Sequence, residues 1–271
     1  MTAFTPNQTT VLVDLDGDGV AEMVGLTGDS LIIYKGDGTG SFTTVASLPN
    51  PSGMGPVFRD MDKDGHLDMV VPGTIWYGKG NLAFDAVTLA STSGQNFAVG
   101  DFDGDGMPDI AIASGVLFGQ GGRTFTSPTG VMPFGIGYAA DIDGDGKDDI
   151  VLTDVYNNIE IYHSVGRAGF IHEQSIAVRT VQTGTIITSM AIADFNGDGV
   201  MDIAVGTLGP DDLFLYTRTP SGEYQVTSYA IGINGVAALA ADFNHDGKPD
   251  IAFLNYGLDY KPPNGVVVLH K

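Results

Sequence analysis

The sequence contains no cysteine and only 12 lysine and arginine residues among 271. Without cysteine, neither disulfide bonds nor thiolate metal sites are available to stabilise the chain. The 33 aspartate and glutamate residues give a formal net charge of −21, which disfavours nucleic acids and anionic membrane surfaces as partners. No run of about 18 apolar residues occurs, so we expect no membrane insertion. Bound cations would relieve much of the negative charge.

One short motif, D-x-[DN]-x-D-G-x-x-[DE], occurs six times and organises the whole chain. The copies are loop 1 (14–22), loop 2 (60–68), loop 3 (101–109), loop 4 (141–149), loop 5 (194–202) and loop 6 (242–250). They begin 40 to 53 residues apart. Units of this size are typical of propeller blades, which have four strands each.

The segments between the loops indicate strands rather than helices. Short runs of small apolar residues flank each loop, as at 97–100 and 109–112. A third run is β-branched and aromatic, and a fourth opens with an aromatic residue. The third runs are 31–34, 74–77, 159–162 and 213–216, and the fourth runs begin around Phe42, Phe84, Phe125, Phe170 and Tyr224. These runs are short and glycine-punctuated, with no apolar stripe of helical period.

The sequence therefore predicts an all-β fold, a six-bladed β-propeller with four antiparallel strands per blade. Residues 1–271 are expected to form a single domain. The last repeat ends after its third strand at 266–269, whereas Ala3-Phe4-Thr5 matches the opening of the fourth strands. We therefore expect the N-terminal strand to close the last blade, which would remove exposed sheet edges.

Each loop is predicted to bind one calcium ion, about six Ca²⁺ per chain. Positions one, three, five and nine carry side-chain oxygens, position six is glycine, and position seven offers a backbone carbonyl, which suits a hard cation that takes six to eight oxygen ligands. The predicted ligands are Asp14, Asp16, Asp18, Val20 and Glu22; Asp60, Asp62, Asp64, His66 and Asp68; Asp101, Asp103, Asp105, Met107 and Asp109; Asp141, Asp143, Asp145, Lys147 and Asp149; Asp194, Asn196, Asp198, Val200 and Asp202; Asp242, Asn244, Asp246, Lys248 and Asp250.

Other interpretations of the loops fit less well. Magnesium would keep more water, and the side-chain ligand positions hold no histidine or cysteine for zinc. The calcium hand of helical proteins needs a glutamate at position twelve, which is absent. Simple Asp-Gly turns favour the same residue types, but a turn does not need four oxygen side chains that repel one another.

On these loops and strand runs, the repeats resemble the FG-GAP or VCBS type. Such repeats occur in integrin α-subunit propellers, in a calcium-containing fungal lectin propeller and beside some polysaccharide-active enzymes. The resemblance covers nearly the whole chain and implies a calcium-binding propeller. It also favours a secreted or cell-surface protein, although the chain as given shows no signal peptide. Integrin α-subunits and that lectin have seven blades, so their ligand residues are not carried over.

Function is less well marked than metal binding. The preferred hypothesis is a non-enzymatic binding module for carbohydrate or glycoprotein. Protein–protein adhesion, or the scaffold of a carbohydrate-active enzyme such as a polysaccharide lyase, is the alternative. No catalytic residue is predicted, because no acid/base pair converges. Variable loops opposite the metal loops are the expected binding region, and the candidate ligand-binding residues are Tyr156, Asn157, Tyr256 and Tyr260.

The aromatics near the end of the third strands are a further recurring feature. They are Tyr34, Tyr77, Phe118, Tyr162 and Tyr216. Such rings can stack on sugars, but recurrence at one strand end favours packing between blades. We therefore interpret them as core residues at a shared blade position.

Overall fold

A computed structural model describes residues 10–89, 97–130, 137–178, 186–208, 212–230, 235–244, 246–255 and 265–269. The chain groups into two compact units. The first unit consists mainly of Phe4–Gly137 with Ser164–Phe170, and the second of Tyr138–His163 with Ile171–Lys271. No helix in the described ranges is long and apolar enough to cross a membrane. The single-domain assignment stays a prediction.

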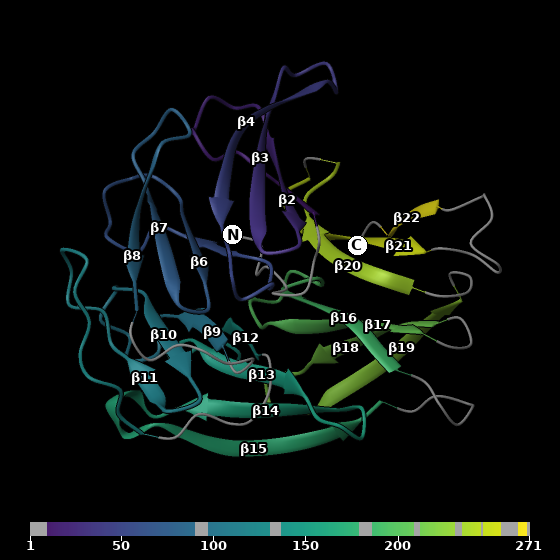
Figure 1. The fold of residues 1–271 in the computed structure, drawn as a ribbon. Coiled ribbons are helices and arrows are strands. Elements are labelled where there is room, and N and C mark those ends of the chain that lie inside the picture. Colours follow the sequence, from purple (N-terminus) through teal and green to yellow (C-terminus); the bar gives the residue numbers. More distant parts are fainter. Residues whose placement is uncertain are drawn as a thin grey trace. The chain divides into compact units, whose positions relative to one another are not determined.

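The first unit contains three antiparallel sheets whose strands follow one another in sequence order. The first sheet comprises β1 (Thr10–Val13), β2 (Glu22–Thr27), β3 (Ser30–Gly36) and β4 (Phe42–Pro49). The second comprises β5 (Val57–Arg59), β6 (Asp68–Val71), β7 (Thr74–Gly78) and β8 (Phe84–Thr88). The third has β9 (Phe97–Gly100), β10 (Asp109–Ile112) and β11 (Gly115–Leu117). Figure 1 shows each sheet as a meander of neighbouring strands.

The second unit repeats the same pattern. Its first sheet has β12 (Gly137–Ala140), β13 (Asp149–Thr153), β14 (Asn158–Ser164) and β15 (Phe170–Ala177), and the short 3-10 turn η1 (Gly166–Ala168) joins the last two. The next sheet has β16 (Ile186–Ala193), β17 (Asp202–Leu208), β18 (Asp212–Arg218) and β19 (Tyr224–Ala230). The last has β20 (Gly235–Ala241), β21 (Asp250–Asn255) and β22 (Gly265–Leu269). In every sheet the metal loop joins the first strand to the second.

The all-β prediction is confirmed, but the prediction of six blades with four strands in each is wrong. Among the described residues only four sheets have four strands, and the sheets β9–β11 and β20–β22 have three. The strand assigned to close the last blade, Ala3-Phe4-Thr5, lies outside the described residues. The fold is therefore a β-propeller as predicted, but the sheets do not all have the same number of strands in the described residues.

A local reason explains the missing strand beside β11. The predicted strand around Phe125 contacts β11 and its extension only through isolated bridges, Val116 to Thr129 and Gly119 to Phe125. The two bridges differ in register by one residue, and Pro128 lies between them. Thr126 donates to Phe118 and Thr129 donates to Val116, so this segment carries one residue more than the strand that it faces. Such a bulge interrupts the ladder, and proline is tolerated at bulges.

Apolar side chains between consecutive sheets form the core of each unit. In the first unit, one cluster joins Leu31 and Ile33 of β3 to Met69 and Val71 of β6. Clusters of the same kind join β5–β8 to β9–β11, β12–β15 to β16–β19, and β16–β19 to β20–β22. Two of the second strands, β6 and β10, are covered on both faces. They are buried along their whole length and consist mostly of apolar residues.

The second residue of a metal loop anchors the loop in this core, a role that the sequence analysis missed. Five of these residues are apolar and buried, namely Leu15, Met61, Phe102, Ile142 and Phe195. The sixth, Phe243, is 47% exposed. The metal loops are therefore held on the core by one side chain each, except in loop 6.

This difference yields a matched test, because Phe195 and Phe243 occupy the same position in loops of nearly the same sequence. Replacing the fully buried Phe195 by alanine should lower the free energy of unfolding by about 3–5 kcal/mol. The variant Phe243→Ala should lower it by less than about 1 kcal/mol. Urea unfolding in excess calcium measures both values. Equal losses in the two variants would contradict the anchoring role.

Candidate metal-binding loops

The first aspartate of each loop folds the loop around its own carboxylate. In loop 3, Asp101 Oδ1 accepts hydrogen bonds from the backbone N–H of Gly104 and Asp105 at 2.9 and 3.1 Å, and Oδ2 accepts one from Gly106 at 2.8 Å. The same bond to the sixth-position glycine recurs in the other five loops. Gly106 has φ +87°, a conformation that glycine adopts without the strain of a side chain.

The side chains at the third and fifth positions also accept hydrogen bonds from the backbone of the loop, two residues further along. Asp103 Oδ1 accepts from the N–H of Asp105 at 3.3 Å, and Asp105 Oδ1 accepts from the N–H of Met107 at 2.9 Å. In loops 5 and 6 the third position is an asparagine, Asn196 or Asn244. Its side-chain oxygen accepts a hydrogen bond from the backbone N–H of the fifth residue. The polar side chains therefore converge. Groups of three acids with ligand atoms within 4.8 Å of one another are Asp14, Asp16 and Asp18; Asp60, Asp62 and Asp68; Asp101, Asp103 and Asp109; Asp141, Asp143 and Asp145.

The ninth residue joins each loop to its sheet through a buried carboxylate. Asp109 Oδ2 accepts from the N–H of Phe102 at 2.8 Å, and Oδ1 accepts from the N–H of Gly119 at 2.8 Å. The first of these bonds recurs in every loop, from the second residue to the ninth. All six ninth-position acids are at most 1% exposed. In loop 1, Glu22 Oε1 is buried with no hydrogen-bond partner.

Burial makes these ninth-position carboxyls weaker acids than usual. Desolvation, together with a smaller effect of the neighbouring loop carboxylates, raises the pKa of Asp68 and Asp202 to about 6 and that of Asp109 to about 7. Desolvation likewise raises the pKa of Glu22. Backbone hydrogen bonds act in the opposite direction. A divalent cation among these oxygens would compensate the buried negative charge.

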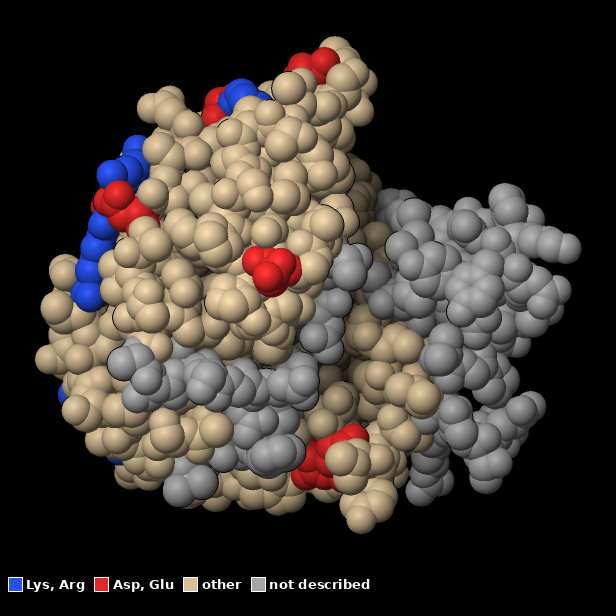
Figure 2. Space-filling view, viewed as in Figure 1, with Lys and Arg blue, Asp and Glu red and all other residues tan. Residues whose placement is uncertain are grey.

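Basic side chains of the described chain lie against the loop acids. In loop 1, Lys35 Nζ lies 2.5 Å from Asp16 Oδ2. Loops 2 and 3 are contacted from the next repeat. Arg123 Nε donates to Asp62 Oδ2 at 2.6 Å, and Arg167 Nε donates to Asp103 Oδ2 at 2.7 Å. Figure 2 shows Lys and Arg gathered along one edge with Asp and Glu beside them, while most of the visible described surface is neutral.

Both arginines also lie over aromatic rings of the sheet that carries the loop. The Arg123 guanidinium is 4.4 Å from the ring centre of Tyr77, and that of Arg167 is 5.1 Å from the ring centre of Phe118. Such cation–π contacts fix the direction of the guanidinium. Each arginine is therefore positioned by a ring in one sheet and directed at the metal loop of that same sheet.

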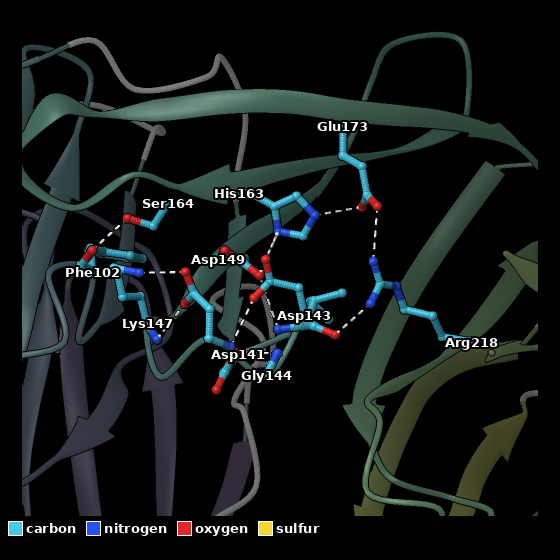
Figure 3. Close-up of polar contacts among 12 residues, drawn as sticks. Phe102, Asp141, Asp143, Gly144, Lys147, Asp149, His163, Ser164, Glu173 and Arg218 are labelled. Atoms are coloured by element: carbon cyan, nitrogen blue, oxygen red, sulfur yellow. Dashed lines mark hydrogen bonds and ion pairs between the residues drawn. The ribbon is translucent and has the colours of Figure 1, made fainter. Parts of the chain in front are cut away.

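In loop 4 an imidazole from a neighbouring strand lies against the acids of the loop (Figure 3). His163 in β14 places Nδ1 2.9 Å from Asp149 Oδ2 and 3.4 Å from Asp143 Oδ2. These three side chains form a second cluster, which shares Asp143 with the carboxylates of the loop. The sequence gives no sign that His163 belongs to loop 4, because the contribution of β14 to the loop is visible only once the strands are paired.

The predicted metal ligands thus lie together within each loop, and their role as ligands stays a prediction. At position seven the backbone N–H donates to the fifth-position carboxylate; these residues are Val20, His66, Met107, Lys147, Val200 and Lys248. Of the candidate ligand-binding residues, Tyr156 and Asn157 lie in the turn between β13 and β14. Tyr256 and Tyr260 lie outside the described residues.

The third-strand aromatics do not share one position, so that part of the sequence interpretation is wrong. Strand pairing places Tyr34, Tyr162 and Tyr216 opposite the residue after the ninth acid. Trp76 and Leu117 occupy this position in their sheets. Tyr77 and Phe118 are thus one residue further along, where each side chain is buried.

Comparisons with known proteins agree with this architecture. A model of FG-GAP-like repeats matches residues 14–71 and 141–205, and a model of FG-GAP repeats matches 93–124 and 187–227. No curated protein matches the sequence significantly.

Several solved structures share the fold at low sequence identity. An Agrocybe aegerita lectin, described by its recognition of non-reducing terminal N-acetylglucosamine, has a TM-score of 0.62 and 18% identity over 99% of this chain and 81% of its own. The Photorhabdus luminescens Tc holotoxin pore gives 0.55 and 16%, over 98% of this chain and 14% of that one. BBS1N, in complex with ARL6DN, gives 0.55 and 15%, over 94% and 76%.

The raised pKa values predict how calcium binding should depend on pH. A carboxylate must be ionised to bind a metal, so calcium affinity should fall as the pH is lowered from about 7 to about 5, with proton release on binding. The stability of the metal-free protein should depend on pH in the opposite direction. A carboxyl with a higher pKa in the folded than in the unfolded protein adds stability when protonated, so the metal-free protein should become more stable as pH falls from about 7 towards about 4.

Calorimetric calcium titrations at several pH values, in two buffers of different ionisation enthalpy, measure the affinity and the released protons together. Thermal unfolding in excess chelator gives the metal-free stability over the same range. Calcium affinity that stays constant between pH 7 and pH 5 would show that the ninth-position acids take no part in binding.

Proposed function

Because the chain belongs to the FG-GAP repeat proteins, we propose that it is a calcium-stabilised β-propeller that binds an external ligand, and that this ligand is a carbohydrate. The proposal has two parts. The first assigns about six structural calcium ions to the six loops. The second assigns the recognition of ligand to surface turns away from those loops.

The calcium assignment is supported by the chemistry of the converging oxygens. In loop 3, three carboxylates lie within 4.8 Å of one another, a separation at which like charges repel strongly in a partly buried site. Calcium takes six to eight oxygen ligands in flexible geometry, which suits carboxylates held by short backbone turns. The buried ninth acid adds charge that only a cation or a proton can balance.

Removing the metal should therefore destabilise the protein strongly. An ion that binds only the folded chain stabilises it by about 2.7 kcal/mol per site at a hundred times its dissociation constant. We expect elemental analysis to find about six calcium ions per chain, and the melting temperature to rise with calcium concentration. An unchanged melting temperature after confirmed removal of metal would mean that the loops are self-sufficient turns.

The observation that carries the carbohydrate assignment is the structural match to the Agrocybe aegerita lectin over 99% of this chain. At 18% identity the match concerns the fold, so the sugar itself is our proposal. Within the sheet β12–β15, the turn between β13 and β14 lies at the opposite end from loop 4. Tyr156 in this turn is 81% exposed, and Asn157 Oδ1 accepts a hydrogen bond from the N–H of Ile187 at 3.2 Å. An exposed ring on a fixed turn offers a stacking surface for a sugar.

A glycan array in the presence of calcium tests this part. The variant Tyr156→Ala should weaken binding about tenfold and leave metal content and melting temperature nearly unchanged, since its ring contributes little to the core. The adjacent Val155→Ala, at an equally exposed residue, is the matched control and should bind as the parent protein does.

The loop variant Asp105→Ala completes the design. It should lower calcium content by one ion and reduce stability while sugar binding at the distant turn persists. Selective loss of sugar binding in a folded Asp105→Ala protein, with Tyr156→Ala unaffected, would show that calcium contacts the ligand directly. Binding of proteins but of no glycan would favour the adhesion alternative. Secretion or surface display stays a prediction from the family.

A further inference from the structure

His163 is oriented so that one ring nitrogen faces two carboxylates. Its Nδ1 lies 2.9 Å from Asp149 Oδ2 and 3.4 Å from Asp143 Oδ2. The ligand atoms of all three side chains lie within 4.8 Å of one another. A nitrogen lone pair and two carboxylates at these distances repel one another, so a cation or a proton must lie between them.

The other ring nitrogen of His163, Nε2, contacts a glutamate on the side away from the loop. His163 Nε2 lies 2.9 Å from Glu173 Oε2, and the second oxygen of Glu173 accepts a hydrogen bond from Arg218 Nη2 at 2.9 Å (Figure 3). Arg218 in turn is 7% exposed and donates to the backbone carbonyl of Ile142. When Nε2–H is donated to Glu173 in the neutral ring, Nδ1 is the nitrogen that carries the lone pair and faces the two aspartates, as in histidines that bind metals.

No comparable nitrogen ligand faces the other loops in the described part of the chain. Loop 1 is contacted by Lys35, and loops 2 and 3 by Arg123 and Arg167. Guanidinium and ammonium groups donate hydrogen bonds but have no lone pair for a metal. In loop 3 the residue placed like His163, opposite the ninth acid, is Phe118. Loop 4 is thus the described loop in which a basic side chain can itself become a ligand.

We propose that Asp143, Asp149 and His163 form a mixed nitrogen–oxygen site that binds a divalent transition ion of the zinc class in preference to calcium. The inference rests on the metal-loop part of the proposed function and deepens it. In a tetrahedral zinc site with bonds of about 2.0–2.1 Å, two ligand atoms lie about 3.3 Å apart, close to the separations seen around Nδ1. Calcium, which prefers oxygen ligands, gains little from an imidazole.

The test uses the full chain, stripped of metal and then saturated with calcium so that the other loops are filled. Calorimetric titration with Zn²⁺ should show one tight site per chain that releases the calcium of loop 4. The variant His163→Phe, which copies the residue of loop 3, should weaken zinc binding at least tenfold. Glu173→Gln, which removes the charge behind the ring, should weaken it about 10- to 100-fold while calcium binding is unchanged.

Two controls separate this site from other histidines and from misfolding. The variant His172→Gln, at a histidine that contacts Glu160 outside the loops, should bind zinc as the parent protein does. If His163→Phe fails to fold, nitrogen NMR of the parent protein decides. With zinc bound, Nδ1 should carry no proton, whereas an imidazolium in a plain salt bridge would be protonated on both nitrogens.

The outcomes are distinguishable from failure of the proposed function. Zinc binding that is equal in the parent and His163→Phe proteins, or an Nδ1 that stays protonated at zinc saturation, would overturn the inference even if calcium binds elsewhere. Loss of the calcium hypothesis has a different signature. It would be seen as a parent protein and an Asp105→Ala variant that both bind no calcium at all.

Discussion

The buried carboxylate at the ninth loop position is the constraint on which the rest of the structure depends. It accepts a hydrogen bond from the second loop residue in all six loops, and in loop 3 it also accepts one from Gly119 just beyond the third strand. One side chain therefore connects the loop to two strands. Because the carboxylate is buried, its charge is costly unless a cation is near. The hydrogen bonds of the fold and the proposed calcium ions would thus both compensate the same buried charge.

Several of the few basic residues form ion pairs with the acids of these loops. Lys35, Arg123 and Arg167 contact third-position acids, so that each loop charge is shared between a side chain and the proposed ion. In these pairs the acid side chain is 5–10% exposed but the basic side chain is 32–54% exposed. An ion pair that stays open to solvent adds at most about 1 kcal/mol, far less than a tightly bound divalent ion. These contacts therefore orient the carboxylates, and the ions would supply most of the stabilisation.

The sequence patterns predicted the features that all repeats share, but they missed the features in which single repeats differ. The loops and the strands beside them followed from spacing, because carboxylates at alternate positions before a glycine have few other uses. The three-stranded sheet β9–β11 was missed, since Pro128 and a one-residue register shift act only through strand pairing. The same shift of one residue separates Tyr77 from Trp76. His163 could not be recognised because it lies outside the motif and joins loop 4 only through the register of β13 and β14.

The direction of the two arginine contacts means that the repeats are not interchangeable parts. Arg123 lies after the third strand of one repeat and serves the loop of the repeat before it, and Arg167 does the same one repeat later. A repeat moved elsewhere in the chain would lose the arginine that contacts its loop, because the following repeat carries that arginine. It would also bring its own arginine next to a loop that lacks the matching contact. Because the two pairs overlap along the chain, a cut anywhere between loop 2 and Arg167 separates at least one acidic loop from its arginine. Gene duplication would meet the same limit, which ties the evolution of loops 2 and 3 to the arginine of the repeat that follows each of them.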